Sequence, residues 1–329
     1  MNTLQLVPVT TSTNGVRYLE IAPEYAGQRI DNFLLRELKG VPKNFIYRIL
    51  RSGEVRLNGG RVRSGTRIQA GDKVRIPPVR LAAPKEDASR PPPHEWVERL
   101  RQAVLYEDHD VLILNKPAGL AVHKGSGIGY GVIEILRVLR SKEPFLELAH
   151  RLDRETSGCL ALAKSPAALR LMQQAFRTRQ VEKRYLALVR GYWNYGCHEV
   201  NQALRRNILR SGERMVQVAD HGRVAQTHFR PINMFRLASL LEARIATGRT
   251  HQVRVHAACM NHPLAGDEKY GDTVFNRKMV KHCGLRRLFL HAHSLGLPLG
   301  GREIIIDAPL DAELKAVLVA LGSGHRKQG

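Results

Sequence analysis

The feature that most constrains the fold is a proline- and charge-rich stretch early in the chain. Residues 81 to about 100 begin Leu-Ala-Ala-Pro-Lys-Glu-Asp-Ala-Ser-Arg-Pro-Pro-Pro-His. Proline fixes φ and removes a backbone donor, so this stretch suits an extended, semi-stiff connection better than a helix or a central strand. The sequence therefore predicts two units, residues 17–80 and residues 101–322, joined by a linker at 81–100.

The first unit has the pattern of two helices followed by short strands. Apolar residues recur at helical spacing over 30–38 and again over 45–50. Asn58-Gly59 is a hairpin-type dipeptide, and Gly71-Asp72 leads into another strand. This order, together with the motifs Gly-x-Val-x-Leu-Asn-Gly and Gly-Asp-x-Val, resembles the S4 RNA-binding domain.

The charge of the chain indicates a polyanionic partner. The chain has 52 Lys and Arg against 30 Asp and Glu, and no apolar run approaches the thickness of a bilayer, so nucleic acid is favoured over a membrane. Lys43, Arg48 and Arg51 lie on or beside the second helix, where they could bind phosphates without reading bases. For any one of them a solvated helix face is the simpler interpretation, whereas the cluster favours RNA.

Two further patterns bear on compartment and metals. The first sixteen residues lack a basic segment followed by a long apolar run, so no secretory signal is predicted and the cytoplasm is expected. The four cysteines are widely spaced, which indicates reduced thiols. Neither His251 with His256 nor His291 with His293 has the spacing of a zinc motif, so no metal site is predicted.

The second unit alternates strands and helices. A strand is expected at 111–114 and a helix over 132–139. Ser165-Pro166 has the pattern of a helix start, with serine as the cap and proline at the first position. Strands are expected at 182–190 and 237–245, the basic stretch 204–214 is either a loop or a hairpin, and Thr250 is a plausible cap for a further helix.

The densest set of reactive groups lies at residues 150–158, His-Arg-Leu-Asp-Arg-Glu-Thr-Ser-Gly. It holds five ionisable side chains and two hydroxyls, and an apolar segment, 159–163, follows directly. We therefore expect a charged loop anchored on a buried strand, with Asp153 as the candidate reactive group. On composition alone a solvated charged turn is the simpler reading.

The pattern His-Arg-Leu-Asp-x-x-Thr-Ser-Gly resembles the catalytic loop of the RluA-type pseudouridine synthases. Lys-Pro-x-Gly at 116–119, Lys-x-Tyr-Leu-Ala-Leu-Val at 183–189 and Gly-Arg-Thr-His-Gln-Val at 248–253 resemble further motifs of that family, which normally has isoleucine where Val253 stands. Gly266-Asp267-x-x-Tyr270-Gly271 and Leu290-His291-Ala292 complete the set.

The resemblance implies an α+β fold, in which a mixed, largely antiparallel sheet forms the catalytic domain behind a small N-terminal S4-like domain. It implies isomerisation of specific uridines to pseudouridine in large-subunit (23S) ribosomal RNA. No atom is gained or lost in that reaction, so no cofactor is expected. The expected partner is ribosomal RNA, and a monomer with no membrane association is expected.

The resemblance also implies roles for single residues. Asp153 would act as nucleophile or base on a base taken out of the stack, and Arg249 would pair with its carboxylate. Tyr185 would pack on the uracil and help to remove its C5 proton, and Arg151 would fill the gap left by the extruded base. The motifs further mark His150, Thr156 and Lys116 as substrate-binding residues.

Two other functions are compatible with parts of the sequence. A non-catalytic S4-domain RNA-binding or ribosome-assembly protein could carry a decayed enzyme domain, although the intact motifs around Asp153, Tyr185 and Arg249 count against decay. A glycosidase using Asp153 and Glu155 is weaker, because side chains two residues apart are poorly placed to flank one bond.

Overall fold

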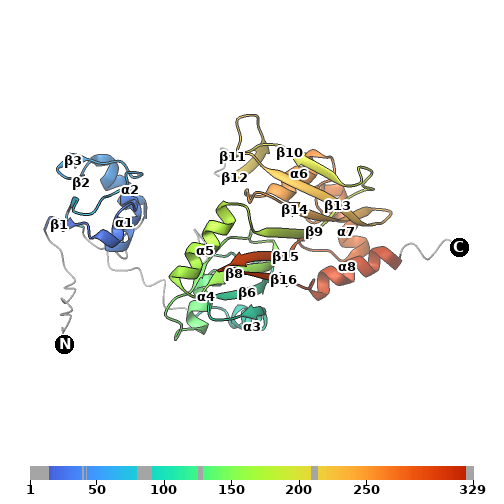
Figure 1. The fold of residues 1–329 in the computed structure, drawn as a ribbon. Coiled ribbons are helices and arrows are strands. Elements are labelled where there is room, and N and C mark those ends of the chain that lie inside the picture. Colours follow the sequence, from blue (N-terminus) through green and yellow to red (C-terminus); the bar gives the residue numbers. More distant parts are fainter. Residues whose placement is uncertain are drawn as a thin grey trace. The chain divides into compact units, whose positions relative to one another are not determined.

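The computed structural model describes residues 15–38, 41, 43–79, 91–124, 129–208 and 214–323. Backbone contacts divide the chain into two compact units, Met1–Pro91 and Pro92–Gly329 (Figure 1). Within the described residues, no helix has both the length and the apolar character needed to cross a bilayer.

The first unit packs two helices on one face of a small antiparallel sheet. The sheet order is β1-β4-β2-β3. The elements are β1 (Arg17–Glu20), the 3-10 turn η1 (Pro23–Tyr25), α1 (Ile30–Glu37), α2 (Lys43–Ser52), β2 (Arg56–Leu57), β3 (Gly60–Arg61) and β4 (Lys73–Ile76). The predicted helix pair and the turn at Asn58-Gly59 are confirmed.

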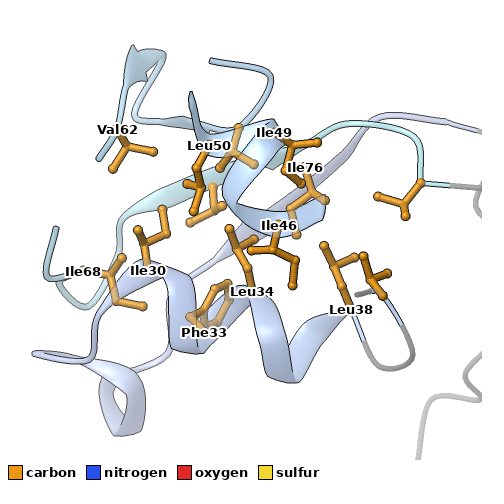
Figure 2. Packing of buried hydrophobic residues seen from close by; sticks show 14 of the residues in the cluster. Ile30, Phe33, Leu34, Leu38, Ile46, Ile49, Leu50, Val62, Ile68 and Ile76 are labelled. Atoms are coloured by element: carbon orange, nitrogen blue, oxygen red, sulfur yellow. The ribbon is translucent and has the colours of Figure 1, made fainter. Parts of the chain in front are cut away.

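The core of the first unit lies between these helices and the sheet (Figure 2). Ile30 and Leu34 of α1 meet Ile46 of α2, because residues three and four apart share a helix face. From the sheet, Val74 and Ile76 of β4 point into the same core. Since side chains alternate along a strand, the residues between them face the opposite side of the sheet.

The second unit is built on a mixed sheet in the order β10-β13-β14-β9-β15-β8-β6-β5, with β16 beside β15 and β7 beside β8. Among the strands that the structure describes, only β8 and β15 pair in parallel, which confirms the largely antiparallel α+β fold. The strands are β5 (Val104–Glu107), β6 (Val111–Lys116), β7 (Glu147–Leu148), β8 (Ser157–Ala163), β9 (Glu182–Arg190), β10 (His198–Asn201), β13 (Gln226–Met234), β14 (Ala238–Ile245), β15 (Leu290–Leu299) and β16 (Arg302–Asp307).

A separate hairpin accounts for the basic stretch at 204–214. β11 (Leu204–Ile208) pairs antiparallel with β12 (Arg214–Val218), so the hairpin alternative is the one that the structure adopts. Residues 209–213, between the two strands, lie outside the described residues.

Helices cover both faces of the central strands. Leu112 and Leu114 of β6 pack toward α3 and α4, whereas Val111 and Ile113 pack toward α5. The helices are α3 (His94–Gln102), α4 (Val132–Leu139), α5 (Pro166–Arg177), α6 (Gln252–Cys259), α7 (Thr273–Cys283) and α8 (Ala312–Ser323). Burial on both sides explains why β6 and β8 are almost continuously apolar.

Helix starts agree with the sequence at one site and differ at two. Ser165 caps α5 by accepting from the Ala168 N–H at 3.0 Å, as predicted. Residues 94–100, assigned above to the linker, are instead helical, because Leu100 of α3 is buried in the core. Thr250 does not cap α6: the cap is His251, in the left-handed region at φ 54°.

Gly158 lets β8 and β15 approach each other. It pairs with Ala292 where the two strands run parallel, and its φ is +110°. A Cβ at this position would lie 2.2 Å from the carbonyl oxygen of Ala292. The glycine of the charged motif is therefore required by this contact, which joins the end of the loop to the centre of the sheet.

Gly158→Ala is therefore expected to destabilise the second unit by at least about 2 kcal/mol, through backbone strain and the clash with β15. Denaturation followed by tryptophan fluorescence isolates this unit, since both tryptophans, Trp96 and Trp193, belong to it. The control is Gly322→Ala in α8, where a Cβ meets nothing within 4 Å. That variant should be neutral or more stable by up to about 1 kcal/mol, and equal stability of the two variants would contradict the argument.

Candidate active site

The charged loop ends in a turn that is fixed by its own backbone hydrogen bond and by a buried side chain. The Thr156 N–H donates to the Asp153 carbonyl at 3.2 Å, and the side chain of Leu152 is buried in the core under α4. The Asp153 side chain itself remains 21% exposed. The loop thus holds the Asp153 carboxylate partly exposed on a restrained backbone, and it is anchored on a buried strand as the sequence predicted.

Lys116, at the end of β6, ties this loop to the neighbouring turn. Its buried Nζ donates to the carbonyls of Pro117 (2.7 Å), Leu120 (2.7 Å) and Arg154 (3.1 Å). Burial lowers the pKa of Lys116 to about 7. The Gly119 N–H also donates to the Arg154 carbonyl, at 2.9 Å. Lys116 was predicted to bind substrate. In this structure its Nζ is hydrogen-bonded to three backbone carbonyls, so it holds the loop.

Asp153 lies where two cavities meet. The larger, of about 850 Å³, is lined by seven Lys and Arg side chains and four Asp and Glu side chains. The smaller, of about 90 Å³, contains Tyr185, Thr156 and Arg249. Arg151, Asp153 and His251 line both. A ligand in the larger cavity can therefore contact Asp153, whereas Tyr185 lines only the smaller one.

The imidazole of His251 lies beside the Asp153 carboxylate. Its Nε2 lies 3.8 Å from an Asp153 carboxylate oxygen, and its Nδ1 lies 2.8 Å from the Tyr270 hydroxyl. That hydroxyl accepts from the Val216 N–H at 2.9 Å and can donate its own proton to Nδ1. In the tautomer that accepts this hydrogen bond, the N–H of the neutral ring lies on Nε2, facing Asp153. Burial lowers the pKa of His251, while Asp153 acts in the opposite direction.

A buried ion pair supports this arrangement from below. Arg254 of α6 makes two hydrogen bonds of 2.7 Å to the carboxylate of Asp267, whose side chain is fully buried. The guanidinium of Arg254 also lies over the Tyr270 ring, 5.1 Å from its centroid. Breaking such a pair would leave an uncompensated buried charge, so the pair fixes Tyr270 and, through it, His251.

Tyr185 of β9 lies in the smaller cavity, as the motif implied. Burial raises the pKa of its phenol, and the negative charge of Asp153 raises it further. The hydroxyl therefore keeps its proton at neutral pH. The ring offers an apolar wall beside the carboxylate.

Arg249 does not pair with Asp153 in this structure. Its Nε donates to the Val224 carbonyl at 3.0 Å, and its backbone N–H donates to the Gln252 side chain at 3.1 Å. The pairing expected above is thus replaced by the His251 contact. Arg249 still lines the smaller cavity and a neighbouring basic cavity that includes Arg205 and Arg223.

The other predicted substrate-binding residues divide into two groups. Arg151 is exposed at both cavities, and Thr156 is buried at the wall of the smaller one. His150 turns inward: its Nε2 accepts from the Ala161 N–H at 3.0 Å, its ring stacks on Phe176, and burial lowers its pKa to about 3. His150 therefore anchors the loop to the sheet and does not line either cavity.

The predicted RNA-binding residues of α2 lie in the first unit. Arg48 and Arg51 are exposed, and the Arg48 guanidinium lies 4.5 Å from the Phe45 ring centroid. The side chain of Lys43 lies outside the described part of the structure.

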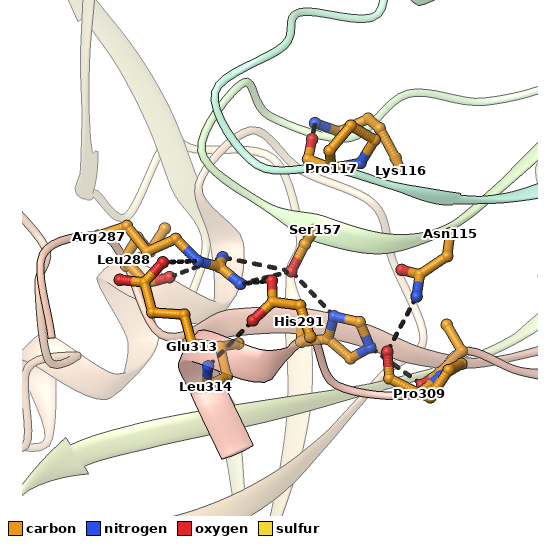
Figure 3. A network of polar contacts seen from close by, with 12 residues as sticks. Asn115, Lys116, Pro117, Ser157, Arg287, Leu288, His291, Pro309, Glu313 and Leu314 are labelled. Carbon is orange, nitrogen blue, oxygen red and sulfur yellow. Dashed lines mark hydrogen bonds and ion pairs between the residues drawn. The ribbon is translucent and has the colours of Figure 1, made fainter. Parts of the chain in front are cut away.

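A polar network behind the loop was not found from the sequence (Figure 3). The Ser157 hydroxyl lies 2.9 Å from Nδ1 of buried His291, whose Nε2 bonds the Ala308 carbonyl. Arg287 donates to the same hydroxyl and forms ion pairs with Asp311 and Glu313. The network joins the start of β8 to β15 and α8. The only sequence signal for it was the Leu-His-Ala motif at 290–292.

The histidines do not gather into a metal site. In the described residues, no group of three or more His, Cys, Asp or Glu side chains is placed to hold a metal ion. The four cysteines are free thiols.

Comparisons with known proteins agree with this architecture. The family model described as RNA pseudouridylate synthase matches residues 110–259, and the S4 domain model matches residues 28–74. The chain is 50% identical to ribosomal large subunit pseudouridine synthase C of Pasteurella multocida (strain Pm70), over 93% of this chain and 94% of that protein. It is 49% identical to the protein of the same name from Escherichia coli (strain K12), over 94% and 98% of the two chains.

A solved structure extends the comparison. The chain is similar to human RNA pseudouridylate synthase domain containing 4, with a TM-score of 0.58 at 28% identity, over 69% of this chain and 95% of that one.

Because Lys116 is buried, its protonation should make the free energy of unfolding depend on pH. The unfolded chain binds this proton up to the ordinary lysine pKa of 10.5, whereas the folded chain releases it near 7. Between these values the unfolded state binds more protons, so the free energy of unfolding of the wild type should rise with pH relative to Lys116→Met. Urea denaturation at several pH values measures the difference.

The control for this prediction is Lys142→Met, which removes an exposed ammonium. Its difference from wild type should not vary with pH over the same range. A wild-type advantage over Lys116→Met that falls with rising pH would show that the three carbonyls hold the proton on Lys116 instead.

Proposed function

The chain belongs to the RNA pseudouridylate synthase family, and on that premise we propose that it converts specific uridines of large-subunit ribosomal RNA to pseudouridine with Asp153 as the reactive carboxylate. The relatives that share about half of its sequence over nearly their whole length carry the name of large-subunit enzymes. The observation that carries the proposal for the site is the position of Asp153 between a basic cavity and a smaller cavity walled by Tyr185.

The basic cavity suits the approach of an RNA strand. Lys124, Arg151 and Arg286 line it and have no ion-pair partner among the described residues, so they are available to phosphates. We assign Arg151 to the space that the target base leaves in the stack, since its planar guanidinium can stack on the neighbouring bases. The cavity thus supplies both attraction and a replacement for the lost stacking.

The reaction proposed for Asp153 breaks the N1–C1′ bond of the uridine, turns the base and joins C5 to C1′. Asp153 acts either as a nucleophile or as a base at the sugar. The smaller cavity, at about 90 Å³, holds little more than a few waters, so side chains must move to admit a uridine. We propose that Arg249 leaves the Val224 carbonyl in that step and pairs with Asp153, which keeps the carboxylate ionised and directed.

Tyr185 is assigned to the uracil. Its ring packs on the base, and its hydroxyl helps to remove the proton from C5 after the new carbon–carbon bond forms. Because the phenol keeps its own proton at neutral pH, we propose a relay: the Tyr185 oxygen takes the C5 proton as its own proton passes to a water molecule, and N1 of the turned base takes up a proton from water.

The first unit is proposed to bind the same RNA outside the active site. Lys43, Arg48 and Arg51 are assigned to phosphates there. All residues assigned to the reaction belong to the second unit of a single chain, so the proposal needs one copy of the protein and no cofactor. The proposed compartment is the cytoplasm, where ribosomal RNA is available.

Replacing Asp153 tests the proposal directly. Asp153→Asn keeps the shape of the side chain but removes the nucleophile and base, so isomerisation should be lost while RNA affinity stays within about twofold. Tritium release from C5-labelled uridine in ribosomal RNA measures turnover. Glu268→Gln, which removes an exposed carboxylate from the large cavity, is the control and should remain active. Turnover by Asp153→Asn would exclude Asp153 as the essential group.

Two substitutions at Tyr185 distinguish its contribution to RNA binding from its contribution to the rate of product formation. Tyr185→Phe keeps the stacking face, so RNA binding should be retained. Loss of the hydroxyl should slow product formation by about 10²–10⁴-fold, the usual effect of removing a general base. Tyr185→Leu should lose both. Single-turnover kinetics on a short RNA decide: a phenylalanine variant as fast as the wild type would show that another group takes the proton.

A further inference from the structure

The outer face of the sheet in the first unit carries a row of side chains that crosses all four strands. Tyr18 of β1 pairs with Arg75 of β4, Arg75 pairs with Arg56 of β2, and Arg56 pairs with Arg61 of β3. Directly paired residues of antiparallel strands share one face of a sheet. We call these four residues, Tyr18, Arg75, Arg56 and Arg61, the outer row.

The outer row faces away from the core. Its neighbours along the strands, Leu19, Val55, Leu57 and Val74, all belong to the hydrophobic core, and alternation places the row on the opposite side. Tyr18 is 70% exposed, a high value for a large aromatic side chain. Nothing in the folding of this unit accounts for an aromatic ring at that position.

The arginines of the row repel one another. Like charges directly opposite each other destabilise a sheet, and here three arginines follow on adjacent strands. Arg75 donates to the Glu54 carbonyl at 2.7 Å, which does not neutralise its charge. Among the described residues neither Arg56 nor Arg61 has an ion-pair partner. An arrangement of this kind is stabilised by an anion with several charges.

A cavity of about 620 Å³ lies on the same face. Tyr18, Arg56 and Arg75 line it, together with Lys73 and the turn at Asn58-Gly59. The backbone at Gly59 has φ +81°, so the turn bends tightly beside the row. The face therefore combines a cavity, an exposed aromatic ring and four cationic side chains, namely the three arginines of the row and Lys73.

We propose that the outer row binds single-stranded RNA, with one base stacked on Tyr18 and the adjoining phosphates along the arginines. Stacking on an aromatic side chain needs an unpaired base, because bases within a duplex are covered by their neighbours. The inference rests on the proposed function in taking RNA as the partner, and it adds a second surface to α2, which carries Arg48 and Arg51 but presents no exposed aromatic ring among its described side chains.

The test measures binding of the full-length protein to a short fluorescent RNA of adenosine and cytidine, alone or paired with its complement, across a salt series. The labelled strand contains no uridine and its complement is DNA, so binding is separate from turnover. Tyr18→Ala should weaken binding to the single strand about tenfold at every salt concentration, with an unchanged salt slope and no effect on the duplex. Tyr18→Phe is the matched control and should bind as the wild type does.

The arginines are expected to give a different signature. Arg56→Gln and Arg61→Gln should each lower the slope of log affinity against log salt by about 0.7, the value for one phosphate contact on a single strand. Arg51→Gln on α2 should lower the slope for single strand and duplex alike.

Three results would overturn the proposal. They are wild-type affinity of Tyr18→Ala for the single strand, an equal loss on single strand and duplex, and a shifted unfolding transition of Tyr18→Ala with unchanged RNA binding, which would mean that the face packs on protein. Isomerisation by the wild type, assayed separately on ribosomal RNA, decides the proposed function and does not depend on these outcomes.

Discussion

The position of the Asp153 carboxylate depends on one buried lysine side chain. Lys116 lies at the end of β6 and donates to three backbone carbonyls, one of which belongs to Arg154, the residue after Asp153. The other end of the loop is fixed where Gly158 lets β8 run beside β15. A loop held at both ends by buried contacts can expose charged side chains without losing its geometry. Rigidity of this kind is what the proposed reaction at Asp153 requires.

The surroundings of Asp153 are arranged in layers of decreasing exposure. Arg151 is open to solvent, His251 is largely covered, and the Arg254–Asp267 pair beneath them is buried. Each layer restrains the next, since Tyr270 connects the buried pair to His251. The cationic side chains of the large cavity attract a polyanion, whereas the inner layers decide where its reacting atoms lie. Exposed cations and buried polar residues around Asp153 therefore have different roles.

The sequence predicts the order of units, most elements and a charged loop anchored on a buried strand, because these depend on local patterns. Helical spacing predicted α1 and α2, and the apolar segment 159–163 predicted where the charged loop ends. The partners of single side chains were less predictable. Lys116 and His150 stand in the family motifs, and the motif alone does not distinguish a residue that holds the loop from one that touches RNA. Arg249 and His251 are two residues apart, and their motif does not tell which of them faces Asp153. In the structure it is His251, at 3.8 Å, whereas Arg249 donates to the Val224 carbonyl.

The most direct test of this account is a map of pseudouridine in unmodified large-subunit ribosomal RNA after incubation with the purified protein. A site that combines a fixed carboxylate, a narrow inner cavity and a separate RNA-binding unit should select its targets. The account predicts pseudouridine at a few discrete positions and unchanged uridine elsewhere. An RNA without new pseudouridine, or with pseudouridine spread over accessible uridines regardless of position, would contradict it.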